Sequence, residues 1–225
     1  MKERTVDIPT SDGAMETFIT HPETGGPFAA VLVYMDIWGV REELYDIARR
    51  IATVGYCGVV HDAFYRAGKM RFEDRDENGK MKSGGKVAPE IRVKAFAVWE
   101  SLKDSMVAED TCAIIEFLGG DKNISTHAMG CIGYCMGGRH VFAAAGHHPG
   151  HFRATASLHG THLATDADDS PHLLADKFQG ELYYGFGEKD QYATPDVIET
   201  LGKALGAADV EYHHIVHAGA EHGYA

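Results

Sequence analysis

The most informative part of the sequence is Gly133-Tyr134-Cys135-Met136-Gly137-Gly138. An apolar run over residues 127–132 precedes it and predicts a buried strand, and residues 139–145 follow it with the composition of a helix. A strand, the pattern G-x-C-x-G and a helix are together typical of a nucleophile elbow that carries cysteine in place of serine. The alternative is a buried structural cysteine in a glycine-rich turn.

The glycines in this stretch meet the steric demands of an elbow. The central residue sits in a strained turn, so the residues two positions to either side, here Gly133 and Gly137, have to be small. Such a turn lifts the sulfur of Cys135 above the edge of the sheet. It also places the following backbone N–H groups at a helix N-terminus, where they can stabilise a thiolate or an oxyanion.

The flanking sequence predicts an α/β fold. Apolar runs over residues 29–34 and 56–60 have strand length, and between them Leu44, Ile47, Ala48 and Ile51 recur at helical spacing. A strand, a helix and a strand within about 35 residues form a βαβ unit, so the sheet is expected to be parallel. Further elements are expected later in the chain: strands over residues 154–158, 182–186 and 210–216, and helices over residues 107–118 and 195–205.

Two segments depart from this alternation. Residues 5–8 and 15–20 alternate in character around the turn at Ser11-Asp12-Gly13, which predicts an antiparallel hairpin at a sheet edge. Residues 65–104 break the alternation: residues 69–86 are charged and glycine-bearing, and we expect an exposed excursion with a helix over residues 92–102. The prediction is a single domain over residues 1–225, with a doubly wound, mostly parallel sheet and an antiparallel N-terminal hairpin.

Composition limits the classes of partner. The net charge of −12 repels nucleic acid and anionic membranes, so neither is expected to bind. No apolar run approaches the roughly 18 residues of a membrane span, and the first residues do not resemble a signal peptide. Four cysteines without a C-x-x-C pair indicate reduced thiols, and hence a cytoplasmic protein. The adjacent histidine pairs at residues 147–148 and 213–214 point in different directions, so neither a metal nor a cofactor is expected.

A nucleophilic cysteine requires a base and an acid that orients the base. In the doubly wound hydrolase order, the acid follows a later strand and the histidine follows the last one. Asp190 lies 55 residues after Cys135, just beyond a predicted strand, and His222 lies 32 residues further on, after the final strand. Taken singly, Asp190 could be a turn carboxylate and His222 is one of 14 histidines. Together with the elbow they predict a Cys135–His222–Asp190 triad.

At this point the sequence resembles the dienelactone hydrolase family, the carboxymethylenebutenolidase-like cysteine members of the α/β-hydrolase fold. The resemblance runs from about Ala29 to His222, and it rests on the elbow and on three further segments, residues 36–40, 187–190 and 221–223. It implies that Cys135 is the nucleophile, His222 the base and Asp190 its orienter. It also implies an oxyanion hole formed by the N–H groups of Ile37 and Met136.

The same resemblance implies further site residues. Asp36 takes the place of a family glutamate that holds the thiol at rest and helps to generate the thiolate, but it is one methylene shorter. Residues 92–99 resemble the segment that grips a substrate carboxylate, with Arg92 as the arginine and Phe96 where the family has a tyrosine hydroxyl. Trp38 is expected to contact the substrate as well.

We therefore expect hydrolysis of a small-molecule lactone or activated ester through a Cys135 thioester, by a monomer or homodimer. Two alternatives remain open: a non-catalytic thiol-based binding or sensing module on the same fold, and acyl transfer to an acceptor other than water. The family fold normally closes with a helix after the histidine loop, whereas this sequence stops three residues after His222. An apolar strip is then expected to be exposed, either because the native protein has a further tail, which we favour, or because another subunit covers the strip.

Overall fold

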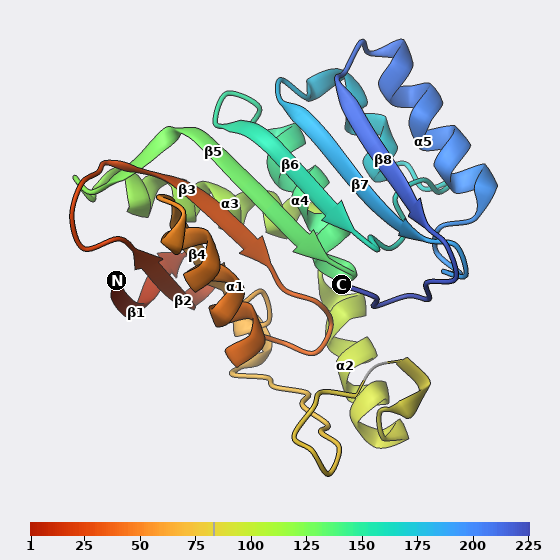
Figure 1. The fold of residues 1–225 in the computed structure, drawn as a ribbon, viewed down its shortest axis with the longest axis horizontal. Coiled ribbons are helices and arrows are strands. Elements are labelled where there is room, and N and C mark those ends of the chain that lie inside the picture. Colours follow the sequence, from red (N-terminus) through yellow and green to blue (C-terminus); the bar gives the residue numbers. More distant parts are fainter. Residues whose placement is uncertain (83) are drawn as a thin grey trace.

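One twisted sheet of eight strands runs through the protein (Figure 1). The computed structural model describes residues 1–82 and 84–225. The strand order across the sheet is β1-β2-β4-β3-β5-β6-β7-β8, antiparallel between β1, β2 and β4 and parallel from β4 onwards. The strands are β1 (Lys2–Thr10), β2 (Gly13–His21), β3 (Phe28–Tyr34), β4 (Cys57–His61), β5 (Ile124–Tyr134), β6 (Phe152–Leu158), β7 (Glu181–Gly187) and β8 (Tyr212–His217).

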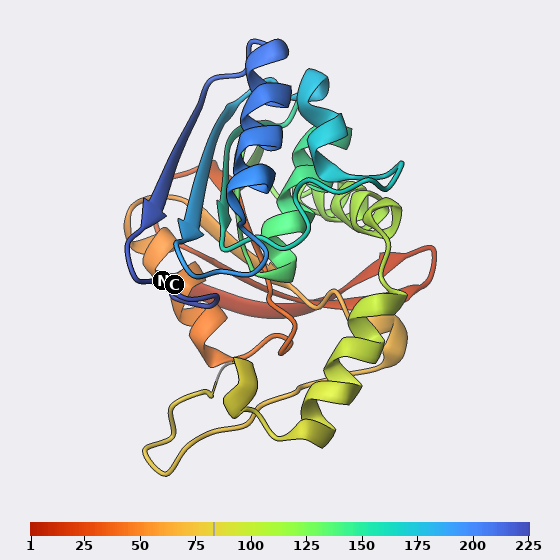
Figure 2. The same ribbon diagram turned by 90° about the vertical axis from the view of Figure 1, so that its right-hand side faces the viewer.

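Helices cover both faces of this sheet. Figure 2 shows α1 on one side and α3, α4 and α5 on the other, while α2 lies beyond the edge where the parallel strands end. The α-helices are α1 (Glu42–Thr53), α2 (Pro89–Ser101), α3 (Asp104–Gly119), α4 (Met136–His147) and α5 (Pro195–Ala207). Short 3-10 turns are η1 (Tyr65–Ala67), η2 (Gly84–Lys86) and η3 (Pro171–Lys177). The predicted doubly wound, mostly parallel sheet with an N-terminal hairpin at its edge is confirmed.

The continuous apolar runs are explained by this two-sided cover. Successive side chains of a strand point to opposite faces, and both faces are packed here. On β3, Leu32 joins the core with Ile114 of α3 and Phe142 of α4, whereas its neighbour Val33 joins a second core with Leu44 of α1. Alternation between apolar and polar residues would have left one of the two layers without a partner.

The excursion over residues 65–104 leaves the sheet at the carboxyl ends of the parallel strands (Figures 1 and 2). Its apolar anchors are Phe72, Val87 and Ala95, which are all buried. Many of its charged side chains are paired, as in Arg66 with Asp110 and Arg71 with Asp62. The excursion is therefore attached to the domain by buried apolar contacts and by ion pairs, which places α2 opposite the elbow.

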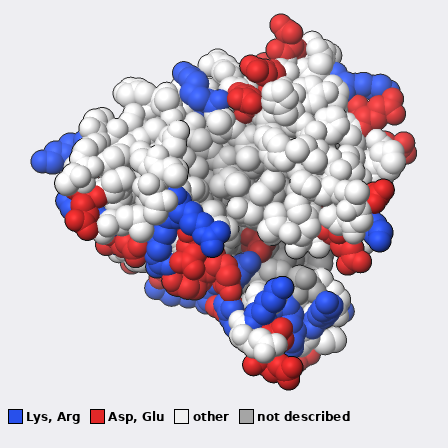
Figure 3. Space-filling model, in the orientation of Figure 1, with Lys and Arg blue, Asp and Glu red and all other residues white. Residues whose placement is uncertain are grey.

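The face over β5 to β8 presents few charged side chains, whereas Lys, Arg, Asp and Glu gather over the lower part of the molecule in the same view (Figure 3). This is where the sequence predicts an apolar strip. On β8, Ile215 is 48% exposed and Val216 is 45% exposed. Across residues 1–82 and 84–225, none of the helices combines the length and the apolar character required to cross a bilayer.

Two buried histidines lie between the sheet and α4. His61 ends β4, with its ring centroid 4.7 Å from that of Tyr34 in an edge-on arrangement, and His140 lies in the second turn of α4. Burial lowers the pKa of His61 to about 4. Burial also lowers the pKa of His140 to about 3, helped by His61 and by the charge of Arg139. Neither Nδ1 atom has a hydrogen-bond partner among the described residues, so both rings stay neutral in the folded protein.

These histidines predict a loss of stability in mild acid. Below pH 6.5 the unfolded chain binds a proton at His61, while the folded protein does not bind it until about pH 4, so stability falls as the pH falls through this window. From pH 7 to pH 5, proton binding at His61 in the unfolded chain lowers the free energy of unfolding by about 2 kcal/mol. Urea denaturation of His61→Phe, which keeps a ring against Tyr34, should show a shallower dependence on pH than the wild type. An unchanged slope in His61→Phe would contradict the account.

Candidate active site

Cys135 occupies a strained turn between β5 and α4. Its backbone has φ 54° and ψ −114°, in the region with positive φ that a residue with a side chain seldom adopts. A Cβ atom at Gly133 would overlap the carbonyl oxygen of Gly137, and one at Gly137 would lie 2.6 Å from the carbonyl oxygen of Met35. The two glycines are therefore required by the close approach of the backbone on either side of the cysteine.

Backbone hydrogen bonds hold the turn in this conformation. The N–H of Cys135 donates to the carbonyl of Leu158 at the end of β6, at 3.1 Å. The carbonyl of Cys135 accepts from Gly138 at 3.0 Å and from Thr161 at 3.2 Å. The elbow is thus attached to the neighbouring strand and to the loop that follows it, and the strain is distributed over a rigid region.

Three predicted site residues, Cys135, His222 and Asp190, meet beyond the carboxyl ends of β5, β7 and β8. Nε2 of His222 lies 3.1 Å from Sγ of Cys135, and Nδ1 of His222 lies 2.8 Å from Oδ2 of Asp190. Asp190 is buried, and its Oδ1 accepts the N–H of Tyr192 at 2.9 Å. With Nδ1–H donating to the carboxylate, Nε2 is left as the acceptor for the thiol proton, which is the tautomer that a general base needs.

Neighbouring rings fix the plane of the His222 imidazole. The Tyr192 ring centroid lies 5.0 Å from that of His222, and the His159 ring lies at the same distance on an edge-on approach. His159 is buried, and burial together with the nearby His222 lowers its pKa to about 4, so it adds no charge at neutral pH. His159 follows the carboxyl end of β6, a position where functional residues of α/β proteins gather, and this rule could have identified it from the sequence.

The thiol of Cys135 is neutral at rest. Burial raises its pKa to about 12, and the negative charges of Asp36 and Asp190 act in the same direction. The backbone N–H groups of Met136 and Ile37 point at the sulfur and lower the pKa, but they do not outweigh the burial. The sulfur therefore carries its proton, and Nε2 of His222 is placed to accept it.

Asp36 makes its hydrogen bonds away from the sulfur. Both carboxylate oxygens accept from the Arg41 guanidinium at 2.7 Å, and Oδ1 also accepts the N–H of Trp38 at 2.9 Å. Within the described chain, no hydrogen bond joins Asp36 to Cys135. The shorter side chain thus serves to pin the loop that carries Ile37, and it affects the thiol through its charge alone.

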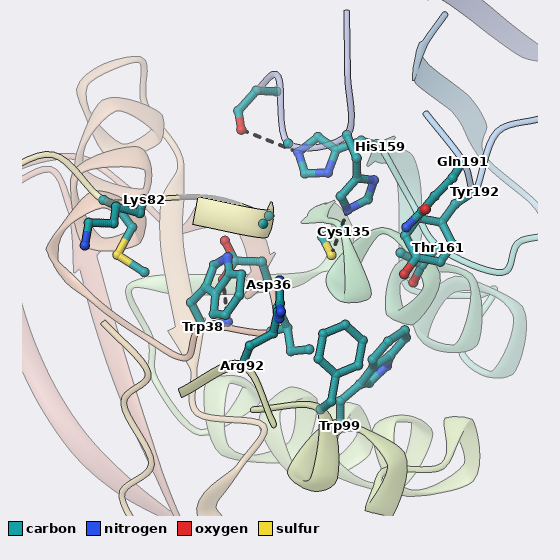
Figure 4. Close-up of a pocket in the computed structure, with 18 of the residues that line it drawn as sticks. Asp36, Trp38, Lys82, Arg92, Trp99, Cys135, His159, Thr161, Gln191 and Tyr192 are labelled. Atoms are coloured by element: carbon teal, nitrogen blue, oxygen red, sulfur yellow. Dashed lines mark hydrogen bonds between the residues drawn. The ribbon is translucent and has the colours of Figure 1, made fainter. Parts of the chain in front are cut away.

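A cavity of about 600 Å³ opens beside Cys135 (Figure 4). The predicted substrate contacts Trp38, Arg92 and Phe96 all line it. The guanidinium of Arg92 has no hydrogen bond or ion pair within the part of the chain that the structure describes. It therefore remains able to pair with a ligand carboxylate.

One wall of this cavity is aromatic: Phe96, Trp99, Tyr192 and His222 line it, and His162 links Trp99 to Tyr192 without lining it. Successive ring centroids are 5.0 to 5.6 Å apart along the series Phe96, Trp99, His162, Tyr192 and His222. The sequence did not single out Trp99, His162 or Tyr192, although Trp99 stands in the same segment as Arg92 and Tyr192 is two residues beyond Asp190. Such a wall favours flat, unsaturated groups on a ligand.

Potential metal ligands lie elsewhere. Among the described residues, Glu181, Glu211 and His213 bring ligand atoms within 4.8 Å of one another. All three are exposed, and they lie at the amino ends of β7 and β8, at the opposite end of the strands from the elbow. Exposed carboxylates often approach in this way without an ion, and this cluster takes no part in the proposals below.

Comparison with known proteins gives the family. The family model described as the dienelactone hydrolase family matches residues 15–225. The chain belongs to this family. It is a hydrolase of the dienelactone hydrolase type, as the sequence resemblance implied.

Relatives and solved structures agree with this assignment. The chain is 26% identical to a Synechocystis protein named as a carboxymethylenebutenolidase, over 100% of the chain and 87% of the relative. It is also 26% identical to one from Methylorubrum extorquens, over 97% of the chain and 71% of the relative. A Klebsiella pneumoniae structure named as a dienelactone hydrolase superposes with a TM-score of 0.80 at 23% identity, covering 99% of this chain and 88% of that one, which shows the shared fold.

The elbow geometry predicts that two glycines of β5 differ in the stability lost when each is replaced by alanine. Gly133→Ala should abolish folding or reduce the unfolding free energy by more than about 3 kcal/mol, because the new Cβ would overlap the backbone of Gly137. Gly130→Ala is the matched control on the same strand, since its Cβ would meet its nearest neighbours at an ordinary 3.6 Å. Denaturant unfolding of both variants tests this, and equal stabilities would contradict the packing described for the elbow.

Proposed function

We propose that this protein is a cysteine hydrolase that cleaves a lactone or another activated ester through a thioester on Cys135. The observation that carries the proposal is the hydrogen-bonded series Cys135 Sγ, His222 Nε2, His222 Nδ1 and Asp190 Oδ2, at 3.1 and 2.8 Å. A nucleophile, its base and the group that orients the base are all within hydrogen-bond reach. Membership of the dienelactone hydrolase family supports the same chemistry.

In the first half-reaction His222 accepts the thiol proton as Cys135 attacks the ester carbonyl carbon. The carbonyl π electrons move to oxygen, and the N–H groups of Ile37 and Met136, which already point at the sulfur, donate to this oxyanion. Collapse breaks the bond to the leaving oxygen, which takes the proton from His222; where it departs as a stabilised enolate or phenolate, His222 gives up that proton to solvent before the second half-reaction. Asp190 remains ionised and stabilises the imidazolium.

In the second half-reaction water hydrolyses the thioester. His222 removes a proton from the water as its oxygen attacks the acyl carbon, the same N–H groups hold the second oxyanion, and the thiol regains its proton as it leaves. A thiolate is itself a good leaving group and would return to a poor ester. The chemistry therefore favours substrates whose own leaving group is stabilised, such as enol lactones and aryl esters.

The cavity supports an anionic, unsaturated substrate. Arg92 lies on the rim of a site with an aromatic wall, and a guanidinium can hold a carboxylate through two parallel hydrogen bonds. Phe96, one turn further along α2, provides a ring but no hydroxyl. We infer that the carboxylate is held by Arg92 alone and that Trp38 and Phe96 contact the apolar part of the substrate.

The free cysteines support a proposal for the cellular location of the protein. All four cysteines are free, and Cys135 has to stay reduced to act. A reducing cytoplasm meets this requirement, and we propose it as the location of the enzyme, as a monomer or a homodimer.

Cys135→Ala should abolish turnover of p-nitrophenyl acetate and of an enol lactone, because it removes the sulfur that His222 contacts and on which the proposed acyl intermediate forms. Mass spectrometry of the wild type after brief exposure to p-nitrophenyl acetate should find a transient acetyl group on Cys135. Cys112→Ala, which removes the exposed cysteine, should react as the wild type does. Retained turnover in Cys135→Ala would overturn the proposed nucleophile.

The two alternatives give different results in the same assay. A thiol-based binding or sensing module would bind the ester without releasing p-nitrophenol from any activated substrate. Acyl transfer to another acceptor would release p-nitrophenol and leave the acetyl group on Cys135 until that acceptor is added. Steady release of acetate in buffer alone is the result that hydrolysis predicts.

Arg92→Ala should raise KM for an anionic lactone by roughly ten- to a hundredfold, since each decade corresponds to about 1.4 kcal/mol of lost pairing. Hydrolysis of a neutral aryl ester should hardly change. Phe96→Tyr should lower KM for the anionic substrate by restoring a hydroxyl donor beside the arginine. Lys94→Ala removes an exposed cation from the same helix and serves as the control for net charge. Equal losses on both substrates in Arg92→Ala would show that the arginine is structural.

A further inference from the structure

Tyr224, two residues beyond His222, packs over the backbone of β7. A Cβ atom at Gly185 would overlap the Tyr224 hydroxyl oxygen, so the complete phenol, hydroxyl included, fits in this place only because residue 185 has no side chain. The hydroxyl is buried and has no hydrogen-bond partner among the described residues. Tyr224 is therefore held here by van der Waals packing, because its hydroxyl makes no hydrogen bond to the described residues.

The same ring supports a residue that touches His222 directly. The Tyr224 centroid lies 5.5 Å from that of His159, in an edge-on arrangement, and 4.6 Å from that of His217 at the end of β8. His159 in turn lies 5.0 Å from His222. A short series of packed rings thus runs from Gly185 to the imidazole that faces Cys135.

The backbone on either side of His222 is held by different means. Before His222, the carbonyl of Ala220 accepts from Lys189 at 2.9 Å and the carbonyl of His217 accepts from Glu188 at 3.1 Å, which ties this part of the loop to the segment that leads to Asp190. After His222, Gly223 has a φ of 80° and turns the chain back, so that Tyr224 lies against Gly185. Tyr224 is the bulky side chain that anchors the second half of the loop.

We propose that Tyr224 is a positioning residue, whose ring, seated over Gly185 and against His159, holds the His222 imidazole in line between Asp190 and Cys135. It touches no reacting atom and acts through His222. The proposal rests on the proposed role of His222 as the base. If it is correct, the ring matters for activity and the hydroxyl does not.

Tyr224→Ala should lower kcat at least about tenfold on a neutral aryl ester with little change in KM, because a small displacement of a catalytic group has a large effect on rate. Tyr224→Phe keeps the ring and should lose much less. Tyr212→Ala is the matched control, since it removes another partly buried tyrosine, from β8, that contacts Tyr184 and His214 and does not contact His159. Thermal melting of each variant separates lost stability from lost alignment.

A double variant, in which the second substitution relieves a steric overlap caused by the first, tests the proposal without relying on Tyr224→Ala. Gly185→Ala alone should reduce kcat, because its methyl group displaces the Tyr224 hydroxyl. Adding Tyr224→Phe removes the overlapping oxygen, after which the nearest ring atom is Cζ at an ordinary 3.4 Å and the flexible tip of Leu158 lies at 3.1 Å. The double variant Gly185→Ala/Tyr224→Phe should therefore recover most of the kcat that Gly185→Ala loses.

A spectroscopic readout separates this proposal from the proposed function. The Nδ1 proton of His222, hydrogen-bonded to Asp190, should give a downfield proton NMR signal that is absent in Asp190→Asn. This signal should persist in Tyr212→Ala and broaden or disappear in Tyr224→Ala, whether or not any ester is turned over. A kcat in Tyr224→Ala as high as in Tyr212→Ala, an undisturbed Nδ1 signal, or a double variant no better than Gly185→Ala would each overturn the positioning role.

Discussion

The active site depends on the strained turn at Cys135. A residue with a side chain is held at φ 54° because the backbone of Gly133, Gly137 and residues 34–35 approaches too closely for any other arrangement. Hydrogen bonds to Leu158 and Thr161 fix the turn to the neighbouring strand. One local conformation thus sets the position of the sulfur, the direction of two backbone N–H groups and the start of α4. The rest of the site is assembled around a sulfur that cannot move far.

The electrostatics of the site follow from the same placement. The raised pKa of Cys135, caused by burial and by two nearby carboxylates, keeps the thiol protonated, and the backbone N–H groups aimed at the sulfur have little charge to stabilise until a substrate arrives. In the proposed mechanism, these N–H groups are thereby reserved for the oxyanion of the transition state, which is where stabilisation increases the rate. It also protects the thiol from oxidation, because the thiolate is the reactive form. The ion pair between Asp36 and Arg41 fixes the loop that supplies one of the two N–H groups.

The sequence was sufficient for the features that depend on local sterics and on periodicity. The elbow could be read from its glycines, the parallel strands from their unbroken apolar runs, and Asp190 and His222 from their positions after later strands. Where a side chain has several possible partners, the sequence did not predict which of them it contacts. Nothing in the sequence indicates that Asp36 binds Arg41, five residues away, instead of the thiol. The ring contacts of Tyr192, His159 and Tyr224 likewise arise only when loops distant in sequence are brought together.

The ionisation of Cys135 is the measurement that tests the central claim most directly. The ultraviolet absorbance of the thiolate can be followed with pH in a Cys112→Ser background, with Cys135→Ala subtracted. The account predicts no ionisation of Cys135 below about pH 9, above the ordinary value of about 8.5 for a free cysteine. It also predicts that His222 is needed for acylation at neutral pH. A Cys135 thiolate already formed at or below about pH 7 would contradict the account, because the cysteine would then exist as a preformed ion pair and not as a neutral thiol activated by its base.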